Sequence, residues 1–304
     1  MNNLTIVIPA YNEEKALTLF LPELIKYCRA NECALIVVND GSRDNTAALL
    51  AEFDKEPFFT SLHNKVNRGY GGAIKSGICA AKTEYVITID ADGQHRLADV
   101  DALYSVILKN DADLVIGKRQ IAKESRYRKF GKTLIRFVAS LLMPIHIQDL
   151  NSGMKIYRTE LVNSYIRLCP NTMAFSDVIT LVFINQQSLV LEHPINTLPR
   201  ITGTSTITTK TAFETVLEIL HIVTMFNPMR VFLPPAFFFL LFSAVWGLPI
   251  LFRGEGISVG TLFLFVTGLT FFFLGLLAEQ LALIRKSITL SSETNFREEP
   301  KEVV

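Results

Sequence analysis

Apolar runs typical of β-strands alternate with helix-period segments through roughly the first 200 residues of the chain. Amphipathic helical patterns fill most of the gaps between these runs. The alternation predicts an α/β fold, in which a mostly parallel sheet has helices on both faces and binds ligands beyond the carboxyl ends of its strands. The predicted strands are Leu4–Pro9, Ala34–Asn39, Phe58–His63, Glu84–Ile89, Asp113–Gly117, Met154–Tyr157 and Leu189–His193.

The hydrophobic pattern changes near Asn227. Residues 231–252 include no charged side chain, and residues 257–284 include one, Glu279, close to the end of the run. A helix over the first run would be about 33 Å long, enough for the ~30 Å hydrocarbon core of a bilayer. The pattern therefore predicts two membrane-spanning helices, with a pair of buried core helices as the alternative.

Basic residues flank the two predicted spans on one side. Arg230 precedes the first span and Arg285 follows the second, whereas the connecting segment 253–256 is short and nearly neutral. By the positive-inside rule, both ends of this hairpin (230–286) face the cytoplasm. We therefore expect residues 1–208 to form a cytoplasmic domain of a multi-pass protein of the cell (inner) membrane, with both termini cytoplasmic.

Two further segments complete the predicted organisation. Apolar residues at helical spacing predict an amphipathic helix on the membrane surface over residues 209–229. An ordinary helix packed on the domain is the alternative. The polar and charged stretch 287–304 is predicted to be a disordered cytoplasmic tail.

Composition excludes several classes of function. Of 304 residues, 49% are apolar, which excludes a disordered chain, and the net charge of +1 provides no general attraction to nucleic acid. The four cysteines form no Cys-x-x-Cys pair, so we expect reduced thiols rather than a disulfide framework or a zinc site.

Aromatic and acidic residues follow the first two predicted strands. The turn Pro9–Glu14 lacks the glycines of a dinucleotide-binding turn, which disfavours a nicotinamide-dependent dehydrogenase. Tyr11 and the neighbouring carboxylates suit stacking on a base and accepting from its N–H groups; a proline turn that starts a helix is the alternative. Asp40 can bind a base or a ribose hydroxyl, whereas Asp44 is interpreted as a helix cap.

A glycine-rich loop and a pair of carboxylates follow the third and fourth strands. The loop 67–75 could bring backbone amides close to an anion, or be only a flexible turn. Asp90 and Asp92 suit a hard cation such as Mg²⁺ or Mn²⁺ that is shared with a diphosphate. An isolated Asp-x-Asp is usually a solvated turn. As the third nucleotide-compatible strand end in one sheet, this pair predicts a site for a nucleotide and a metal.

These motifs, in this order, resemble those of family 2 glycosyltransferases of the GT-A fold. The segments that match are Ile8–Glu14, Asn39–Ser42, Asn67–Gly69 and Asp90–Gln94. The most similar subgroup is the polyprenyl-phosphate glycosyltransferases, which include dolichyl-phosphate mannose synthase and have membrane-anchored members. The resemblance covers about residues 4–230. It implies a three-layer α/β/α domain followed by the interfacial helix and the membrane hairpin.

The resemblance implies roles for individual residues. The nucleotide is expected to contact Pro9, Ala10, Tyr11, Glu13, Asp40, Arg68, Asp90, Ala91 and Arg200. A divalent cation, Mg²⁺ or Mn²⁺, is expected at Asp90, Asp92 and Gln94. The acceptor is expected at Arg119, Ser125, Arg126, Asp149, Asn151 and Ser152. The sequence departs from the family pattern at Met154, usually aromatic, and at Thr206, commonly lysine, which leaves the donor preference open.

A basic segment follows the fifth predicted strand. Arg126, Lys129 and Arg136 can share one face of a helix with an apolar flank, which suits binding of a lipid phosphate. A solvated basic face beside a core stripe is the alternative. Together with the spans and the resemblance, the pattern favours a polyprenyl phosphate acceptor held by Arg119 and Arg126.

The expected reaction is transfer of a sugar from a GDP- or UDP-linked donor to a polyprenyl phosphate, undecaprenyl or dolichyl, with inversion. A phosphate monoester is mostly ionised at neutral pH and needs no strong base, while a metal at Asp92 would offset charge on the leaving diphosphate. Asp177 is a candidate base for a hydroxyl acceptor, or a helix cap or surface acid. A non-catalytic nucleotide-sugar-binding membrane protein is the other alternative. Gly260, Gly268 and Gly275 could support close helix packing within the hairpin or with a second copy.

Overall fold

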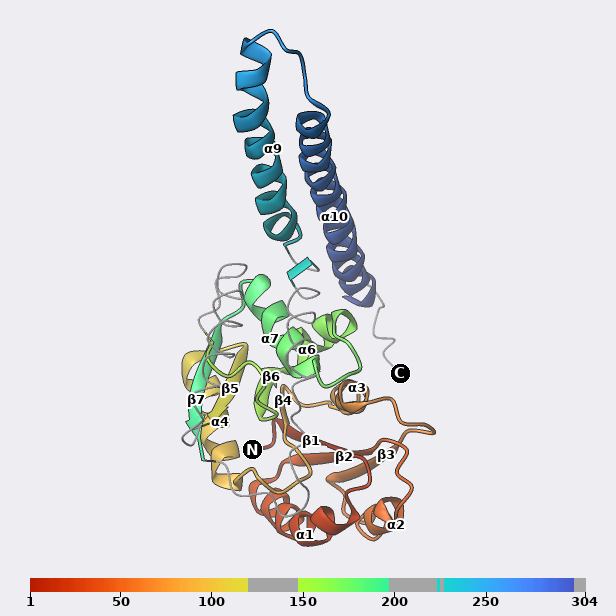
Figure 1. Ribbon diagram of the computed structural model, residues 1–304. Helices are drawn as coiled ribbons and strands as arrows, with labels where there is room; N and C mark the ends of the chain where they lie inside the picture. Colours follow the sequence, from red (N-terminus) through yellow and green to blue (C-terminus); the bar gives the residue numbers. More distant parts are fainter. Residues whose placement is uncertain (120–146, 197–222, 225–226, 298–304) are drawn as a thin grey trace. The chain divides into compact units, whose positions relative to one another are not determined.

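The computed structural model describes residues 1–119, 147–196, 223–224 and 227–297 (Figure 1). The chain divides into two compact units, one formed by residues 1–124 and 146–206 and the other by residues 125–145 and 207–304. The described part of the first unit is an α/β domain. The described part of the second is mainly a helical hairpin.

A seven-stranded sheet forms the centre of the α/β domain, with the order β3-β2-β1-β4-β6-β5-β7. The pairs are parallel except at β6, which runs antiparallel to both β4 and β5. The predicted mostly parallel sheet is confirmed, and each predicted strand end lies within two residues of the observed one. The strands are β1 (Leu4–Ala10), β2 (Ala34–Asn39), β3 (Phe59–His63), β4 (Tyr85–Thr88), β5 (Leu114–Arg119), β6 (Lys155–Arg158) and β7 (Val190–Ile195).

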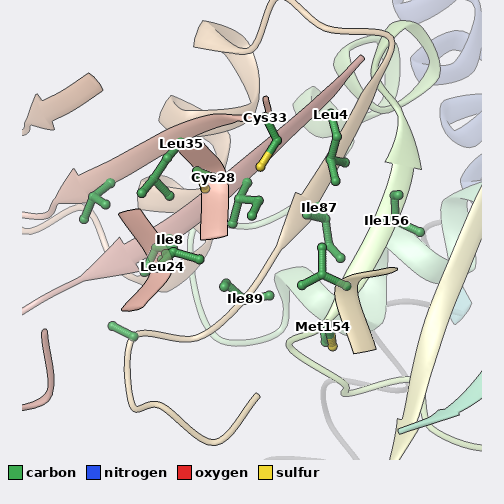
Figure 2. Packing of buried hydrophobic residues seen from close by; sticks show 14 of the residues in the cluster. Leu4, Ile8, Leu24, Cys28, Cys33, Leu35, Ile87, Ile89, Met154 and Ile156 are labelled. Atoms are coloured by element: carbon green, nitrogen blue, oxygen red, sulfur yellow. The ribbon is translucent and has the colours of Figure 1, made fainter. Parts of the chain in front are cut away.

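Helices cover both faces of the sheet, because alternate side chains of its central strands are buried on opposite sides. Leu4 and Ile8 of β1 pack with Leu24 and Cys28 of the first helix (Figure 2). Val7 points to the other face, toward the third helix. On one side lie α1 (Glu14–Asn31), α2 (Thr46–Ala51) and α4 (Leu97–Asn110); on the other lie α3 (Tyr70–Ala80), α6 (Thr159–Tyr165), the 3₁₀ turn η1 (Ile166–Leu168) and α7 (Phe175–Asn185).

The hairpin consists of α9 (Met229–Phe252) and α10 (Val259–Arg297). Residues 229–252 and 259–285 are long and apolar enough to cross a membrane. A Cβ atom added at Gly268 would lie 2.8 Å from Leu240 Cγ, and one at Gly275 would lie 2.9 Å from Phe232 Cβ. Both glycines therefore allow close packing between α9 and α10, as small residues do in membrane helix pairs.

The segments that flank the hairpin differ from the sequence prediction or lie outside the described residues. Helix α10 continues to Arg297, so the stretch 287–297 is helical and the expectation of disorder there is wrong. The amphipathic helix expected over 209–229 lies almost entirely outside the described residues, and so does the remainder of the expected tail, 298–304.

Candidate active site

The carboxyl ends of β1 and β2 meet at one edge of the sheet. Their parallel register pairs Ala10 with Asn39, and the Asp40 N–H donates to the Ala10 carbonyl at 2.8 Å. Tyr11, just beyond β1, keeps 42% of its surface exposed. Pro9, Ala10, Tyr11 and Asp40 are thus brought together as the sequence predicts, while their contact with a nucleotide stays a prediction.

Asp40 is buried, and its carboxylate already accepts several hydrogen bonds. The backbone N–H groups of Arg68 and Gly69 donate to it at 3.0 Å and 2.9 Å, and Asn64 Nδ2 donates at 2.7 Å. Because all three donors belong to the segment between β3 and α3, Asp40 organises that loop. This role was not apparent from the sequence.

The glycine-rich loop packs against another part of the chain. A Cβ atom at Gly69 would lie 2.6 Å from the Asn171 carbonyl oxygen, and one at Gly71 would lie 2.6 Å from that of Pro170. The Gly72 N–H donates to the same Asn171 carbonyl at 3.2 Å. Neither an anion site nor a flexible turn describes these contacts. The glycines instead let the first turn of α3 approach the segment 169–172, since any side chain there would collide with backbone.

Asp90, after β4, is held on several sides. The Tyr70 hydroxyl donates to its Oδ1 at 2.9 Å, and His95 Nε2 lies 3.5 Å from its Oδ2. A Cβ atom at Gly153 would lie 2.2 Å from Oδ2. Partial burial tends to raise the pKa of Asp90, but hydrogen bonds from His95 and Tyr70 and the charge of Arg119 outweigh it and lower the pKa below its ordinary value. Asp90 therefore stays ionised at neutral pH.

The expected metal ligands have the chemistry of an open cation site. Asp92 and Gln94 are half-buried, and the Gln94 N–H donates to Asp92 Oδ1 at 3.1 Å in the turn that Ala91 begins. Within the described ranges, no group of three or more His, Cys, Asp or Glu side chains forms a complete cation site. Mg²⁺ is typically held by one or two carboxylates together with substrate phosphates, so this donor set fits a metal shared with a diphosphate.

Arg119, the last residue of β5, forms a two-pronged ion pair with Asp149. Its Nε lies 2.9 Å from Oδ2 and its Nη2 lies 2.8 Å from Oδ1. The Arg119 N–H also donates to Oδ2 at 3.0 Å, and Nη2 donates to the Asn151 carbonyl at 3.0 Å. The side chain of Arg119 is 41% exposed. The guanidinium is thus fixed in direction by the 149–151 loop and still reaches solvent.

The other predicted acceptor residues differ in position. Ser152 has no solvent exposure, and its hydroxyl donates to the Gly117 carbonyl at 2.6 Å. This hydrogen bond ties the 149–153 loop to β5. Ser125, Arg126 and Arg200 lie outside the described residues, as do Lys129 and Arg136.

Asp177 lies in the first turn of α7 and is half-buried. Ala174 is the N-cap residue of this helix, so the interpretation of Asp177 as the cap is wrong. The hydrogen bond to Asp149 and the charge of Asp177 both help to raise the pKa of Arg119, whereas burial lowers the pKa of Lys155 even though Asp177 opposes that change. Asp177 therefore belongs to the same cluster of charges as Arg119.

Three residues near this site were not identified from the sequence: Tyr70, His95 and Lys155. Tyr70 and His95 contact Asp90, and Lys155 is buried at the start of β6. A lysine at a strand position ordinarily points to solvent, so its type gave no signal. The histidine directly follows the metal motif, which was the available clue.

The chain is similar to known proteins in both sequence and structure. Residues 5–166 match the family model described as "Glycosyl transferase family 2", and residues 227–284 match the one described as "GtrB C-terminal hairpin". The second match covers all of α9 and residues 259–284 of α10.

Two relatives illustrate the similarity in sequence. A dolichyl-phosphate beta-glucosyltransferase from Trichomonas vaginalis is 33% identical over 173 residues, which are 52% of this chain and 53% of that protein. An undecaprenyl-phosphate 4-deoxy-4-formamido-L-arabinose transferase from Pectobacterium atrosepticum is 27% identical over 299 residues, 93% of this chain and 89% of that protein. The chain spans about half the length of several of the curated relatives it matches.

A solved structure with the same fold is glucosyl-3-phosphoglycerate synthase from Mycobacterium tuberculosis, in complex with Mn²⁺, UDP-glucose and phosphoglyceric acid. The TM-score is 0.57 at 16% identity, over 73% of this chain and 79% of that one. At this identity the likeness concerns the fold, and it agrees with the expected GT-A type architecture.

Proposed function

The chain belongs to glycosyltransferase family 2, and from this premise we propose that it transfers a sugar from a nucleotide diphosphate sugar to a polyprenyl phosphate in the membrane. The observation that carries the proposal is the arrangement of Asp90, Asp92 and Arg119 around one sheet edge, in a chain that also contains two apolar helices of membrane length. Relatives named as dolichyl-phosphate and undecaprenyl-phosphate sugar transferases support the same acceptor class.

On the donor side, Tyr11 offers an exposed ring for a base, and Asp90 is held ionised by its neighbours. Asp90, Asp92 and Gln94 would hold Mg²⁺ or Mn²⁺, whose charge would offset that of the leaving diphosphate. Tyr70 keeps its proton, because burial and the charge of Asp90 raise its pKa well above the ordinary value. It therefore donates to Asp90 and would hold that carboxylate in position for the metal.

On the acceptor side, Arg119 and Arg126 would hold the lipid phosphate. Asp149 fixes the direction of the Arg119 guanidinium, which suits a planar, two-pronged contact with phosphate oxygens. Because the acceptor phosphate is already ionised near neutral pH, it can attack the anomeric carbon without a general base. In-line attack from the side opposite the diphosphate inverts the anomeric centre.

The proposed arrangement in the cell follows from the spans. In this arrangement, residues 1–208 form the cytoplasmic catalytic domain, residues 209–229 an interfacial helix and residues 230–286 the membrane hairpin. The protein lies in the inner membrane, and both termini are in the cytoplasm. The flanking arginines support this orientation.

The test is transfer of label to lipid. Purified full-length protein is incubated with a polyprenyl phosphate and labelled UDP- and GDP-sugars in Mg²⁺, Mn²⁺ or EDTA, and label is followed into organic solvent. We expect metal-dependent label from one donor, and a loss of kcat of about 100-fold in Asp92→Asn. Asp111→Asn is the matched control, because Asp111 is a surface residue whose left-handed backbone conformation suits asparagine.

Full turnover by Asp92→Asn at saturating Mg²⁺ would overturn the mechanism. Absence of lipid label from every donor, with nucleotide-sugar binding intact, would instead favour a hydroxyl acceptor or the non-catalytic class.

A further inference from the structure

Lys155, the first residue of β6, stands out because its side chain has no solvent exposure. Its ammonium donates to the carbonyl oxygen of Leu150 at 2.6 Å and to that of Ser176. Leu150 belongs to the loop before β6, whereas Ser176 lies in the first turn of α7. One buried cation therefore joins two segments that are separate in the fold.

Four titratable groups from separate parts of the domain act on Lys155. They are Asp177 of α7, Asp149 of the loop, Arg119 of β5 and the thiol of Cys169 after η1. Burial lowers the pKa of Lys155 to about 8, although the charges of Asp177 and Asp149 oppose that change. A buried charge costs folding free energy unless it is paired, so a lysine at this position points to a task beyond packing.

The loop that Lys155 anchors positions two groups of the site. Asp149 in this loop fixes the guanidinium of Arg119. Gly153, at the other end of the loop, lies against the carboxylate of Asp90. A shift of the loop would therefore displace both the donor-side carboxylate and the acceptor-side cation.

The second segment that Lys155 contacts leads to the same carboxylate. Ser176 interacts with the side chain of Tyr70, and the Tyr70 hydroxyl donates to Asp90. Lys155 thus reaches Asp90 by two routes, through the loop and through α7.

We propose that Lys155 is a positioning residue, whose buried positive charge fixes the 149–153 loop against α7 and thereby sets Asp90 and Arg119 for sugar transfer. This inference rests on the proposed function. In this role Lys155 touches neither substrate and acts through the groups that do.

The first experiment compares kcat/KM for the lipid acceptor in the wild type and Lys155→Met between about pH 7 and about pH 9.5. We expect Lys155→Met to lose about 10- to 100-fold at the lower pH, since a misplacement near 1 Å has an effect of that size. The ratio of kcat/KM in the wild type to that in Lys155→Met is the quantity of interest. Titration of the acceptor and pH effects on the metal act on both proteins and therefore cancel in this ratio. The wild-type advantage should shrink as Lys155 loses its charge, to a smaller constant value that reflects its remaining hydrogen bonds.

Two further variants separate charge from side-chain bulk. Lys155→Arg keeps its charge throughout this range, so its rate should not share the decline that follows loss of the lysine charge. Lys82→Met removes an exposed lysine and should match the wild type at every pH. A wild-type to Lys155→Met ratio that stays constant with pH, or that equals one throughout, would overturn the proposal.

A second measurement does not depend on sugar transfer. Because the pKa of Lys155 is lowered in the folded protein, the unfolded chain binds more protons between about pH 8 and about pH 10.5. The thermal midpoint of the wild type should therefore rise relative to that of Lys155→Met over this range, opposite to the trend in activity. An unchanged difference in midpoint would mean that burial does not lower the pKa of Lys155, and the expected decline of the wild-type advantage with pH would then fail as well.

Binding of Mn²⁺ and nucleotide separates failure of this inference from failure of the proposed function. If the wild type binds nucleotide with Mn²⁺ but labels no lipid, the proposed function falls. In that case, the positioning role is tested by nucleotide binding alone. We expect Lys155→Met to bind nucleotide with Mn²⁺ about 10-fold more weakly than the wild type, because Asp90 would be displaced. Equal binding by the two proteins would overturn it.

Discussion

At the scale of single residues, Asp90 takes its position from neighbours whose types were not conspicuous in the sequence. Tyr70 donates to one carboxylate oxygen, and His95 approaches the other. Gly153 has no side chain, which leaves room for the Asp90 carboxylate. The expected carboxylate is present, but its direction depends on these three contacts. A residue's type alone therefore indicated the chemistry available, and its surroundings decide how that chemistry is used.

Gly153→Ala tests this dependence. The added Cβ atom would lie 2.2 Å from Asp90 Oδ2, so the carboxylate has to move. We expect sugar transfer to fall about 100-fold, because a shift near 1 Å at a reacting group has an effect of that size. Initial rates at saturating donor measure the change.

The matched control is Gly260→Ala, since a Cβ atom there would meet nothing nearer than Ser258 Oγ at 4.0 Å. Its activity should equal that of the wild type. Wild-type rates in Gly153→Ala would show that the contact with Asp90 is not needed for activity.

At the scale of elements, the close fit of α3 on the sheet supports the sheet edge at which the candidate site lies. A Cβ atom at Gly77 would lie 2.3 Å from Val7 Cγ1 of β1 and 3.1 Å from Val38 Cγ2 of β2. The same helix begins in the glycine-rich loop that Asp40 holds. The distance between α3 and β1 therefore helps set the position of Tyr70, in the first turn of α3.

Gly77→Ala should destabilise the fold by about 1–3 kcal/mol through overpacking against β1. Val7→Ala should also destabilise it, because buried methyl groups are lost. In the double variant the new methyl group occupies the space vacated by valine, so the combined loss should be smaller than the sum of the single losses. Thermal or denaturant unfolding measures all three, and strictly additive losses would contradict the close fit.

At the scale of the whole molecule, the proposal requires the catalytic domain and the turn between the two apolar helices to lie on opposite sides of a membrane. Both helices are long enough to cross it. The chain offers a convenient internal reference, because Cys79 is exposed while Cys28, Cys33 and Cys169 are buried. Cys79 belongs to α3 and thus reports the side of the catalytic domain.

Labelling with a membrane-impermeant maleimide tests the orientation. In Gly254→Cys, the new thiol lies in the turn between α9 and α10, where a Cβ atom meets nothing within 4 Å. We expect this thiol to react in spheroplasts and Cys79 to react in inverted vesicles. The Gly254→Ala variant, which adds no thiol, should show the Cys79 signal alone, and labelling of both thiols from one side would contradict two crossings.

The order of apolar and polar residues by itself determined the seven strands, the mostly parallel sheet and the two apolar helices, because periodicity records which faces of an element are buried. Residues at the strand ends, read in order, also determined the family resemblance. Both kinds of information are local, so packing between distant segments did not alter them.

Tertiary structure alone decided how the site is supported. It joined Lys155 to Ser176, Asp40 to the loop at Gly69, and the glycines of α3 to the segment 169–172. Each contact links positions that are far apart in the chain, and no local sequence pattern predicts it. The physical reason is that a buried polar group is satisfied by whichever partner the packing of whole elements brings within reach, and that partner is fixed when the elements assemble.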